Sequence, residues 1–254
     1  MLNKLLQSVG IGSAQVDTVL ANTTCVPGGT LSGEVRIRGG NSAQDIETIY
    51  LSLVTDYQIE IDDTKCNRSV DLNRVHVSDR FTVQAGENLV MPFSVPVPLN
   101  APASLGKTRV WLRTGLDIKS AVDPTDRDYL EVKPHPLVEA FVEAASRLGF
   151  RLYQVDSEKT DYRHAGNGLP FYQEFEFKPF NGEFRGRLDE LEAAFSLTET
   201  GAVVTLQVDR AVRGLGSLLS ESMGMDESYT SFAYTQADMP MLDQLLAKAI
   251  RPYC

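Results

Sequence analysis

The sequence contains few cysteines and few histidines. There are three of each among 254 residues, no CxxC pair occurs, and their positions match no zinc-ligand spacing. They are Cys25, Cys66, Cys254, His76, His135 and His164. An odd number of cysteines in a chain of this length argues against a disulfide-stapled scaffold and indicates a reducing compartment. We therefore expect a cytoplasmic protein without a metal centre.

Long hydrophobic runs are also absent. No stretch approaches the roughly 18 consecutive apolar residues of a membrane span, so we expect no integral membrane segment. Residues 1–9 lack the hydrophobic core of a signal peptide, and the spacing of their leucines predicts a short helix. That helix is too short and too weakly basic to lie on a membrane, so we expect it to pack on the protein or on a second copy of the chain.

Positively charged residues are also few. Lysine and arginine total 24 against 34 aspartates and glutamates, which gives a net charge of −10. The acidic excess occurs in both halves of the chain and is not confined to a tail. Such a chain repels phosphate backbones, so we expect no nucleic-acid partner. The remaining composition, with 43% hydrophobic residues, is ordinary for a folded globular protein.

The first half of the chain alternates between apolar and polar residues. This period of two covers residues 31–37, 49–53, 89–97 and 110–116, with glycine- and proline-rich turns between them. Alternation places one set of side chains inward and the other outward, as in half-buried antiparallel strands. We therefore predict a β-sandwich domain over residues 1–133.

The second half mixes helical and strand patterns. After a stiff connector, apolar spacing predicts helices near residues 136–148 and 240–250. Alternation predicts strands over residues 171–177 and 204–212. We expect these elements to form a β-rich domain over residues 134–254.

Two stretches of the second half are harder to interpret. Residues 187–197 fit either a helix or a strand. Residues 214–238 are rich in Gly, Ser, Asp and Glu, which predicts a mobile loop or short helices.

Several runs of the sequence resemble known proteins. The run PGGTLSGEVRIRGG at residues 27–40 resembles the opening of arrestin-like domains. The runs VWLRTGLDI at 110–118 and AVDPTDRDYLEV at 121–132 resemble the signature of the bacterial sporulation-control family often called SpoOM. Two shorter runs, QEFEF at 173–177 and VDR at 208–210, also resemble that family, so the resemblance covers nearly the whole chain.

The resemblance implies a fold and a role. The implied fold is mainly β, with two β-sandwich-like domains in an arrestin-like arrangement and a few short helices. The implied role is regulatory, without known catalysis, and arrestin relatives usually act as scaffolds that hold partners on loops and sandwich edges. We therefore expect a regulator that binds a protein partner. A membrane-trafficking scaffold, a small-molecule-binding protein, a hydrolase and a homodimer are the open alternatives.

Two loops carry weak ligand motifs. Residues 101–108, APASLGKT, fit a relaxed nucleotide-loop pattern, but a strand pattern follows where a phosphate loop needs a helix, which favours a β-turn. Acidic residues between positions 117 and 131 are dense enough to suggest calcium, yet the required glycine bend and bidentate offset are missing. A solvated or internally paired acidic turn is favoured. We expect no cofactor.

Catalysis has no support in the motifs. None of the histidines neighbours a nucleophile element such as G-x-S-x-G, so we predict a non-enzymatic protein without catalytic residues. Trp111 lies on the same strand face as Arg109 and Arg113, which are types enriched at binding hot spots. The alternative is that Trp111 belongs to a second buried face, because large aromatic side chains are mostly buried.

Opposite charges lead to a hypothesis about the two halves. Arginine binds carboxylates through a bidentate fork, and arrestin-like proteins often hold their domains together through a polar core. We therefore hypothesise an interdomain clasp, and the alternative is that each group pairs locally or stays solvated. The residues of this clasp are Asp117, Asp123, Asp126, Asp128, Arg210 and Arg213.

Overall fold

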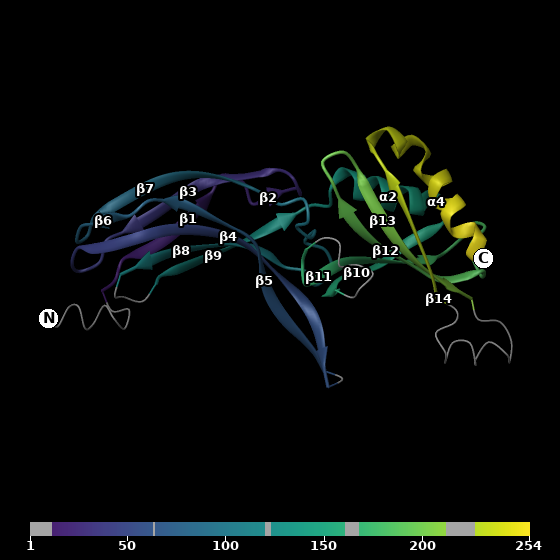
Figure 1. Ribbon diagram of the computed structural model, residues 1–254, viewed down its shortest axis with the longest axis horizontal. Coiled ribbons are helices and arrows are strands. Elements are labelled where there is room, and N and C mark those ends of the chain that lie inside the picture. Colours follow the sequence, from purple (N-terminus) through teal and green to yellow (C-terminus); the bar gives the residue numbers. More distant parts are fainter. Residues whose placement is uncertain (1–11, 63, 120–122, 161–167, 212–226) are drawn as a thin grey trace. The chain divides into compact units, whose positions relative to one another are not determined.

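The structure is a computed structural model that describes residues 12–62, 64–119, 123–160, 168–211 and 227–254 (Figure 1). The helix predicted for residues 1–9 lies outside the described residues. So does residue 213 of the predicted clasp.

The chain forms two compact units, each assembled from separate segments. Unit 1 contains Met1–Asp56, Ser69–Ser104 and Arg109–Lys133. Unit 2 consists of the remaining residues, which are Tyr57–Arg68, Leu105–Thr108 and Pro134–Cys254. Two short segments from the first half of the sequence therefore belong to unit 2. The predicted folding domains, residues 1–133 and 134–254, stay a prediction.

The described part of unit 1 contains two sheets. One has three antiparallel strands, with β3 (Thr30–Arg38) between β1 (Gln15–Leu20) and β7 (Asn88–Pro96). The other is built around β4 (Gln44–Ile61), whose tip belongs to unit 2. Its further strands are β8 (Val110–Ile118), β9 (Thr125–Val132), β2 (Thr24–Cys25), β5 (Thr64–Ser78) and β6 (Phe81–Val83).

Alternating side chains of these sheets build one core. Val35 and Ile37 of β3 are at most 2% exposed, and so are Leu112 and Leu116 of β8. All four belong to a single cluster of buried side chains. Their sequence neighbours on β3 point to the opposite, exposed face, as the period of two requires. The strands predicted from alternation are therefore present.

In its described residues, unit 2 contains five antiparallel strands that pair in chain order. They are β10 (Phe150–Lys159), β11 (Phe171–Pro179), β12 (Leu188–Leu197), β13 (Ala202–Arg210) and β14 (Glu227–Tyr234). Beyond β10, the β4 residue Gln58 pairs with Glu158 in parallel orientation. Of the two first-half segments in unit 2, residues 57–68 contribute the end of strand β4, and residues 105–108 form a turn.

Two α-helices cover one face of the unit 2 sheet (Figure 1). Helix α2 (Pro136–Arg147) begins with a proline in its first turn, and the His135 side chain caps it by accepting the Leu137 N–H at 3.2 Å. Helix α4 (Leu242–Ile250) lies between two 3-10 turns, η2 (Gln236–Met241) and η3 (Arg251–Tyr253). The fully buried Phe141 packs against Phe177 and Phe195 of the sheet. Both predicted helices are present, and the mainly β class of the chain is confirmed.

The stretch that fitted helix or strand is strand β12. A β-bulge between Leu188 and Glu190 shifts the pairing with β13 by one residue. As a result, Leu188 and Leu191 both face the core, although they are three positions apart. This spacing imitates a helical pattern in the sequence.

The prediction of a loop or short helices over residues 214–238 is wrong for residues 227–234. Residues 214–226 lie outside the described residues, and residues 236–238 belong to the 3-10 turn η2. Residues 227–234 form strand β14, which pairs with β13 along its whole length. Aromatic and β-branched residues favour this strand. Tyr234 is 2% exposed, and its hydroxyl donates to the Leu137 carbonyl oxygen at 3.0 Å. In the sequence, many polar residues precede this short aromatic segment, so the composition of the whole stretch predicts a loop and the strand is missed.

Candidate functional site

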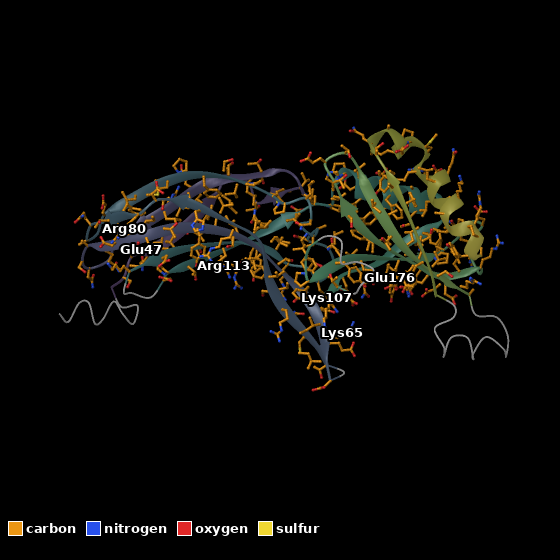
Figure 2. The ribbon with its side chains drawn as sticks, in the orientation of Figure 1. Glu47, Lys65, Arg80, Lys107, Arg113 and Glu176 are labelled. Carbon is orange, nitrogen blue, oxygen red and sulfur yellow. The ribbon has the colours of Figure 1, made fainter. Side chains whose placement is uncertain are left out.

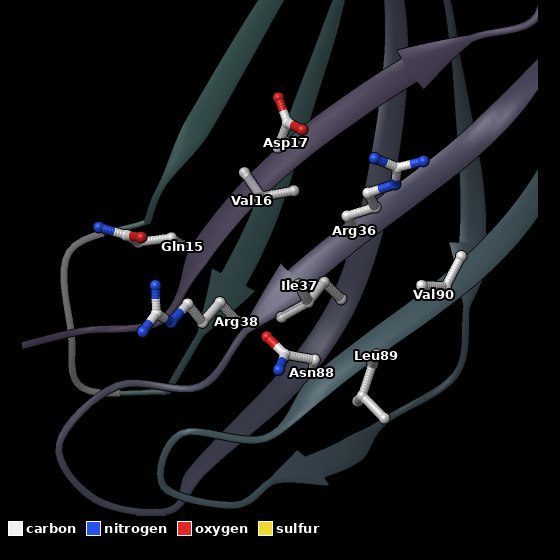
Figure 3. A pocket seen from close by; sticks show the side chains of 9 residues that line it. All are labelled: Gln15, Val16, Asp17, Arg36, Ile37, Arg38, Asn88, Leu89 and Val90. Atoms are coloured by element: carbon white, nitrogen blue, oxygen red, sulfur yellow. The ribbon is translucent and has the colours of Figure 1, made fainter.

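A groove lies on the three-stranded sheet of unit 1 (Figure 3). Its volume is about 390 Å³, within the range of sites that hold small ligands or a few side chains. Three stretches far apart in the sequence become neighbours through strand pairing. The lining residues are Gln15, Val16, Asp17, Arg36, Ile37, Arg38, Asn88, Leu89 and Val90.

Strand register arranges the polar lining residues in rows. Gln15 of β1 pairs with Arg38 of β3, which pairs in turn with Asn88 of β7. In antiparallel strands, directly opposite side chains project from the same face with Cβ atoms roughly 4.5–5.5 Å apart. Arg38 is therefore flanked by two carboxamides. The next row places Arg36 between Asp17 and Val90.

The two arginines of the groove differ in their partners. Arg36 forms an ion pair with Glu34 at 3.4 Å, between the guanidinium Nη2 and a carboxylate oxygen. Arg38 forms no ion pair with any residue that the structure describes. Because neighbouring residues compensate only one of the two guanidiniums, the groove offers one available cation.

Apolar side chains supply the rest of the groove. Val90 is 57% exposed on the polar face, whereas Val16, Ile37 and Leu89 share the intervening register row and pack against the core below. The lining contains hydrogen-bond donors and apolar surface, but no serine, cysteine or histidine. This arrangement can hold an anionic group beside an apolar one.

The predicted acidic residues Asp126 and Asp128 lie beside the edge of β1. The Asp126 carboxylate accepts the backbone N–H of Thr18 at 2.7 Å. Burial, followed by the negative charges of Asp126 and Asp17, raises the pKa of Asp128 to about 6. Asp126 is therefore hydrogen-bonded to β1, and Asp128 lies close enough to Asp126 and Asp17 for their charges to raise its pKa.

The other two predicted aspartates are separate from that pair. Asp123 accepts the backbone N–H of Ile118, the last residue of β8, at 2.9 Å. Asp117 is exposed on β8, opposite Thr48 of β4. Among the described residues, no group of three or more His, Cys, Asp or Glu side chains could hold a metal ion.

Trp111 is buried rather than presented to solvent. It is 3% exposed, its ring contacts Tyr129 at 6.1 Å between centroids, and the Arg127 guanidinium lies over it at 4.7 Å. The interpretation of Trp111 as an exposed partner anchor is therefore wrong, and the alternative of a buried face is correct. A long arginine covers the ring because its stem and planar head pack well on an aromatic surface.

Arg210, the described arginine of the predicted clasp, lies at the end of β13 in unit 2. Its Nη2 donates to the Ser228 hydroxyl at 3.3 Å. Asp117, Asp123, Asp126 and Asp128 all lie in unit 1. The interdomain clasp stays a prediction.

Residues 105–108 form a turn, as favoured over a phosphate loop. The Thr108 N–H donates to the Leu105 carbonyl oxygen at 3.0 Å, and strand β8 follows. Gly106 has a φ of +58°, and its Cα lies so close to the Val155 carbonyl that a Cβ would approach the oxygen to 2.0 Å. The missing helix excludes the phosphate-binding geometry of a nucleotide loop here.

Sequence reasoning missed an acidic face on the unit 2 sheet, opposite the helices. Burial and neighbouring carboxylates raise the pKa of Glu174 to about 7 and of Glu192 to about 8. Glu176, which is labelled in Figure 2, lies directly opposite Glu192 in the strand register. Its carboxylate forms an ion pair with Lys178 at 3.0 Å. The alternation of glutamate with phenylalanine in residues 173–177 was the available signal. The carboxylates of this acidic face are Asp156, Glu158, Glu174, Glu176, Glu190, Glu192 and Asp209.

Fold and groove together define a class: a mainly β protein of two units, with a ligand-sized groove on an exposed sheet face of one of them. Within the described residues, no helix is long and apolar enough to cross a membrane.

Comparison with known proteins identifies the family. The chain belongs to the SpoOM protein family, whose model matches residues 2–212. It is 39% identical over 242 residues to the sporulation-control protein Spo0M of Bacillus subtilis strain 168, covering 95% of this chain and 93% of the relative. The crystal structure of Spo0M from Bacillus subtilis matches with a TM-score of 0.85 and 38% identity. That match covers 96% of this chain and 100% of the other. The suspected family is confirmed.

Proposed function

We propose that this chain is a non-enzymatic, cytoplasmic regulator in sporulation control that binds a protein partner through the groove of unit 1. The regulatory role is supported by the family and by the name of the 39% identical relative. The binding mode is supported by the groove itself.

The observation that carries this proposal is the chemistry of the groove lining. Exposed Val90 lies next to arginine and carboxamide side chains on a single sheet face. Arginine beside apolar surface is typical of protein-binding patches. The lining has no nucleophile and no histidine, so it favours recognition over group transfer.

The role is tested by complementation in a Bacillus subtilis strain that lacks spo0M. We expect this chain to restore the number of heat-resistant spores. Val90→Glu, which places a carboxylate in the groove, should abolish that effect. Ser94→Glu is the matched control, because Ser94 is exposed on the same strand and the same face but does not line the groove.

The binding mode is tested in the same cells with a photo-crosslinking amino acid at position 90 or 94. We expect a specific protein adduct from position 90 and not from position 94. Equal labelling from both positions, or no protein adduct from position 90, would contradict binding through the groove. Co-purification of a metabolite in place of a protein would favour the small-molecule alternative.

A further inference from the structure

The row formed by Gln15, Arg38 and Asn88 has the composition of a carboxylate-binding site. Arg38 has no ion-pair partner among the described residues, and its guanidinium presents a planar fork of N–H donors. The two flanking carboxamides each carry an NH₂ donor. Figure 3 shows the three side chains on one face of the sheet. Resting on the proposed function, we propose that this row binds a single carboxylate side chain in an extended segment of the protein partner.

The charges around the row favour a single negative charge on the ligand. Glu34 already neutralises Arg36. Asp17 occupies the neighbouring row and pairs across the strands with Arg36, not with Arg38. A second negative charge on the ligand would meet the Asp17 carboxylate, and like charges at such distances repel. The groove therefore suits a carboxylate better than a dianionic phosphate.

The apolar lining favours a peptide over a free carboxylate. A carboxylate on an exposed arginine alone contributes little to binding, because water and salt screen the pair. Val90, which is 57% exposed and lies in the neighbouring row, adds apolar surface on the same sheet face. A peptide whose glutamate is flanked by apolar residues covers both parts of the groove, whereas acetate covers only one.

Titration of the isotopically labelled full-length protein, followed by NMR, tests the proposal. The probe is acetyl-Leu-Glu-Leu-amide, and its matched control is the peptide with glutamine in place of glutamate. We expect the probe to shift the side-chain N–H signals of Gln15, Arg38 and Asn88. The glutamine peptide should shift them at least about tenfold more weakly, because a charge-assisted hydrogen bond is lost. Acetate and inorganic phosphate should also bind more weakly than the probe.

Variants separate a carboxylate site from general attraction to arginine. Arg38→Gln should weaken binding of the probe about tenfold. Arg80→Gln, an exposed arginine of unit 1 outside the groove that pairs with Asp45 and Glu47, should leave it unchanged. Asp17→Asn should strengthen phosphate binding more than probe binding, because it removes the charge that disfavours a dianion.

The outcomes distinguish this proposal from the proposed function. Equal binding of the two peptides, unchanged binding by Arg38→Gln, or tighter binding of phosphate or acetate overturns the carboxylate site. If cross-linking from position 90 still captures a protein, and that capture is insensitive to Arg38→Gln, the regulator binds its partner through this groove by other chemistry. If position 90 captures no protein while the probe binds, the carboxylate belongs to a different kind of ligand, and the proposal also fails.

Discussion

The two units bury one face of an antiparallel sheet in different ways. In unit 1 a second sheet covers the first, and one cluster of aliphatic side chains fills the space between them. In unit 2 helices α2 and α4 cover the sheet, and aromatic rings such as Phe141 and Phe177 fill the core. Alternation alone therefore reports that one face is buried. It does not report whether a sheet or a helix covers that face.

The exposed faces of the two sheets differ as well. The groove face of unit 1 mixes charges and leaves Arg38 without an ion pair among the described residues. The acidic face of unit 2 concentrates carboxylates, and their partial burial together with repulsion from neighbouring carboxylates raises the pKa of Glu174 and Glu192. The acidic residues are therefore distributed differently over the two exposed sheet faces. On unit 1 the Arg38 guanidinium has no ion-pair partner among the described residues, whereas on unit 2 like charges on opposite strands destabilise the fold.

The largest expected effect concerns the turn at residues 105–108, which comes from the first half of the sequence but belongs to unit 2. Gly106→Ala should destabilise unit 2 by about 3 kcal/mol or more, because the new methyl group meets the Val155 carbonyl and φ is positive. Hydrogen exchange of the β10–β13 amides measures this loss.

The matched control for that prediction is Gly86→Ala in unit 1. Gly86 has a φ of +66°, and nothing lies within 4 Å of the position that the new methyl group would take. The substitution should cost only about 1 kcal/mol from the backbone conformation. Trp111, the single tryptophan, reports the unfolding of unit 1 through its fluorescence. Equal losses in the two variants would contradict the tight packing of Gly106.

An intermediate effect is expected for the acidic face. The pKa of Glu192 is about 8 in the folded protein and near 4.5 in the unfolded chain. The unfolded state therefore releases this proton first, and stability falls as pH rises from about 4.5 to 8. Glu192→Gln should remove that loss and stabilise unit 2 by about 1–2 kcal/mol at pH 8, a value reduced for solvent screening.

Urea unfolding of Glu192→Gln at pH 5 and pH 8 measures this effect. Little difference from the parent protein is expected at pH 5, where the glutamate is protonated in the folded state. Glu183→Gln is the control, because Glu183 forms an exposed ion pair with Arg251 in the same unit. A gain at pH 8 that also occurs at pH 5 would contradict the assigned charge repulsion.

The smallest expected effect tests the predicted clasp. Asp123→Asn combined with Arg210→Gln should show a coupling energy of about 0.5–1 kcal/mol if the clasp exists. A double-mutant cycle of unfolding free energies measures it. Each residue also has a partner inside its own unit, Ile118 and Ser228 respectively, so strictly additive effects would favour local pairing alone.

Much of the fold could be predicted because local patterns determine it. Strands β3, β4, β7 and β8 of unit 1 and helices α2 and α4 follow directly from their periodicity. Strand β12 was ambiguous because its bulge places Leu188 and Leu191 on one face. Strand β14 was missed because its few aromatic residues follow a long polar stretch, and only pairing with β13 reveals its role.

The groove could not be predicted in the same way. Arg36 and Arg38 were visible as the polar face of one strand, but residues 15–17 and 88–90 join them only through register. Register depends on contacts between distant segments, which a single sequence does not display. The acidic face is distributed over four strands for the same reason. Trp111 shows that a residue type alone does not decide between burial and binding.

The hydrogen bond between Asp126 and Thr18 has a consequence for self-association. Strand β1 is an edge of its sheet, and an edge offers unpaired backbone donors to any extended chain, including another copy of the same protein. The Asp126 carboxylate occupies one such donor near the middle of β1. A second molecule that extended the sheet here would have to displace a carboxylate and meet the negative charges of Asp17 and Asp128. The acidic side chains therefore protect this edge against aggregation, which leaves the protein free to display the groove beside it.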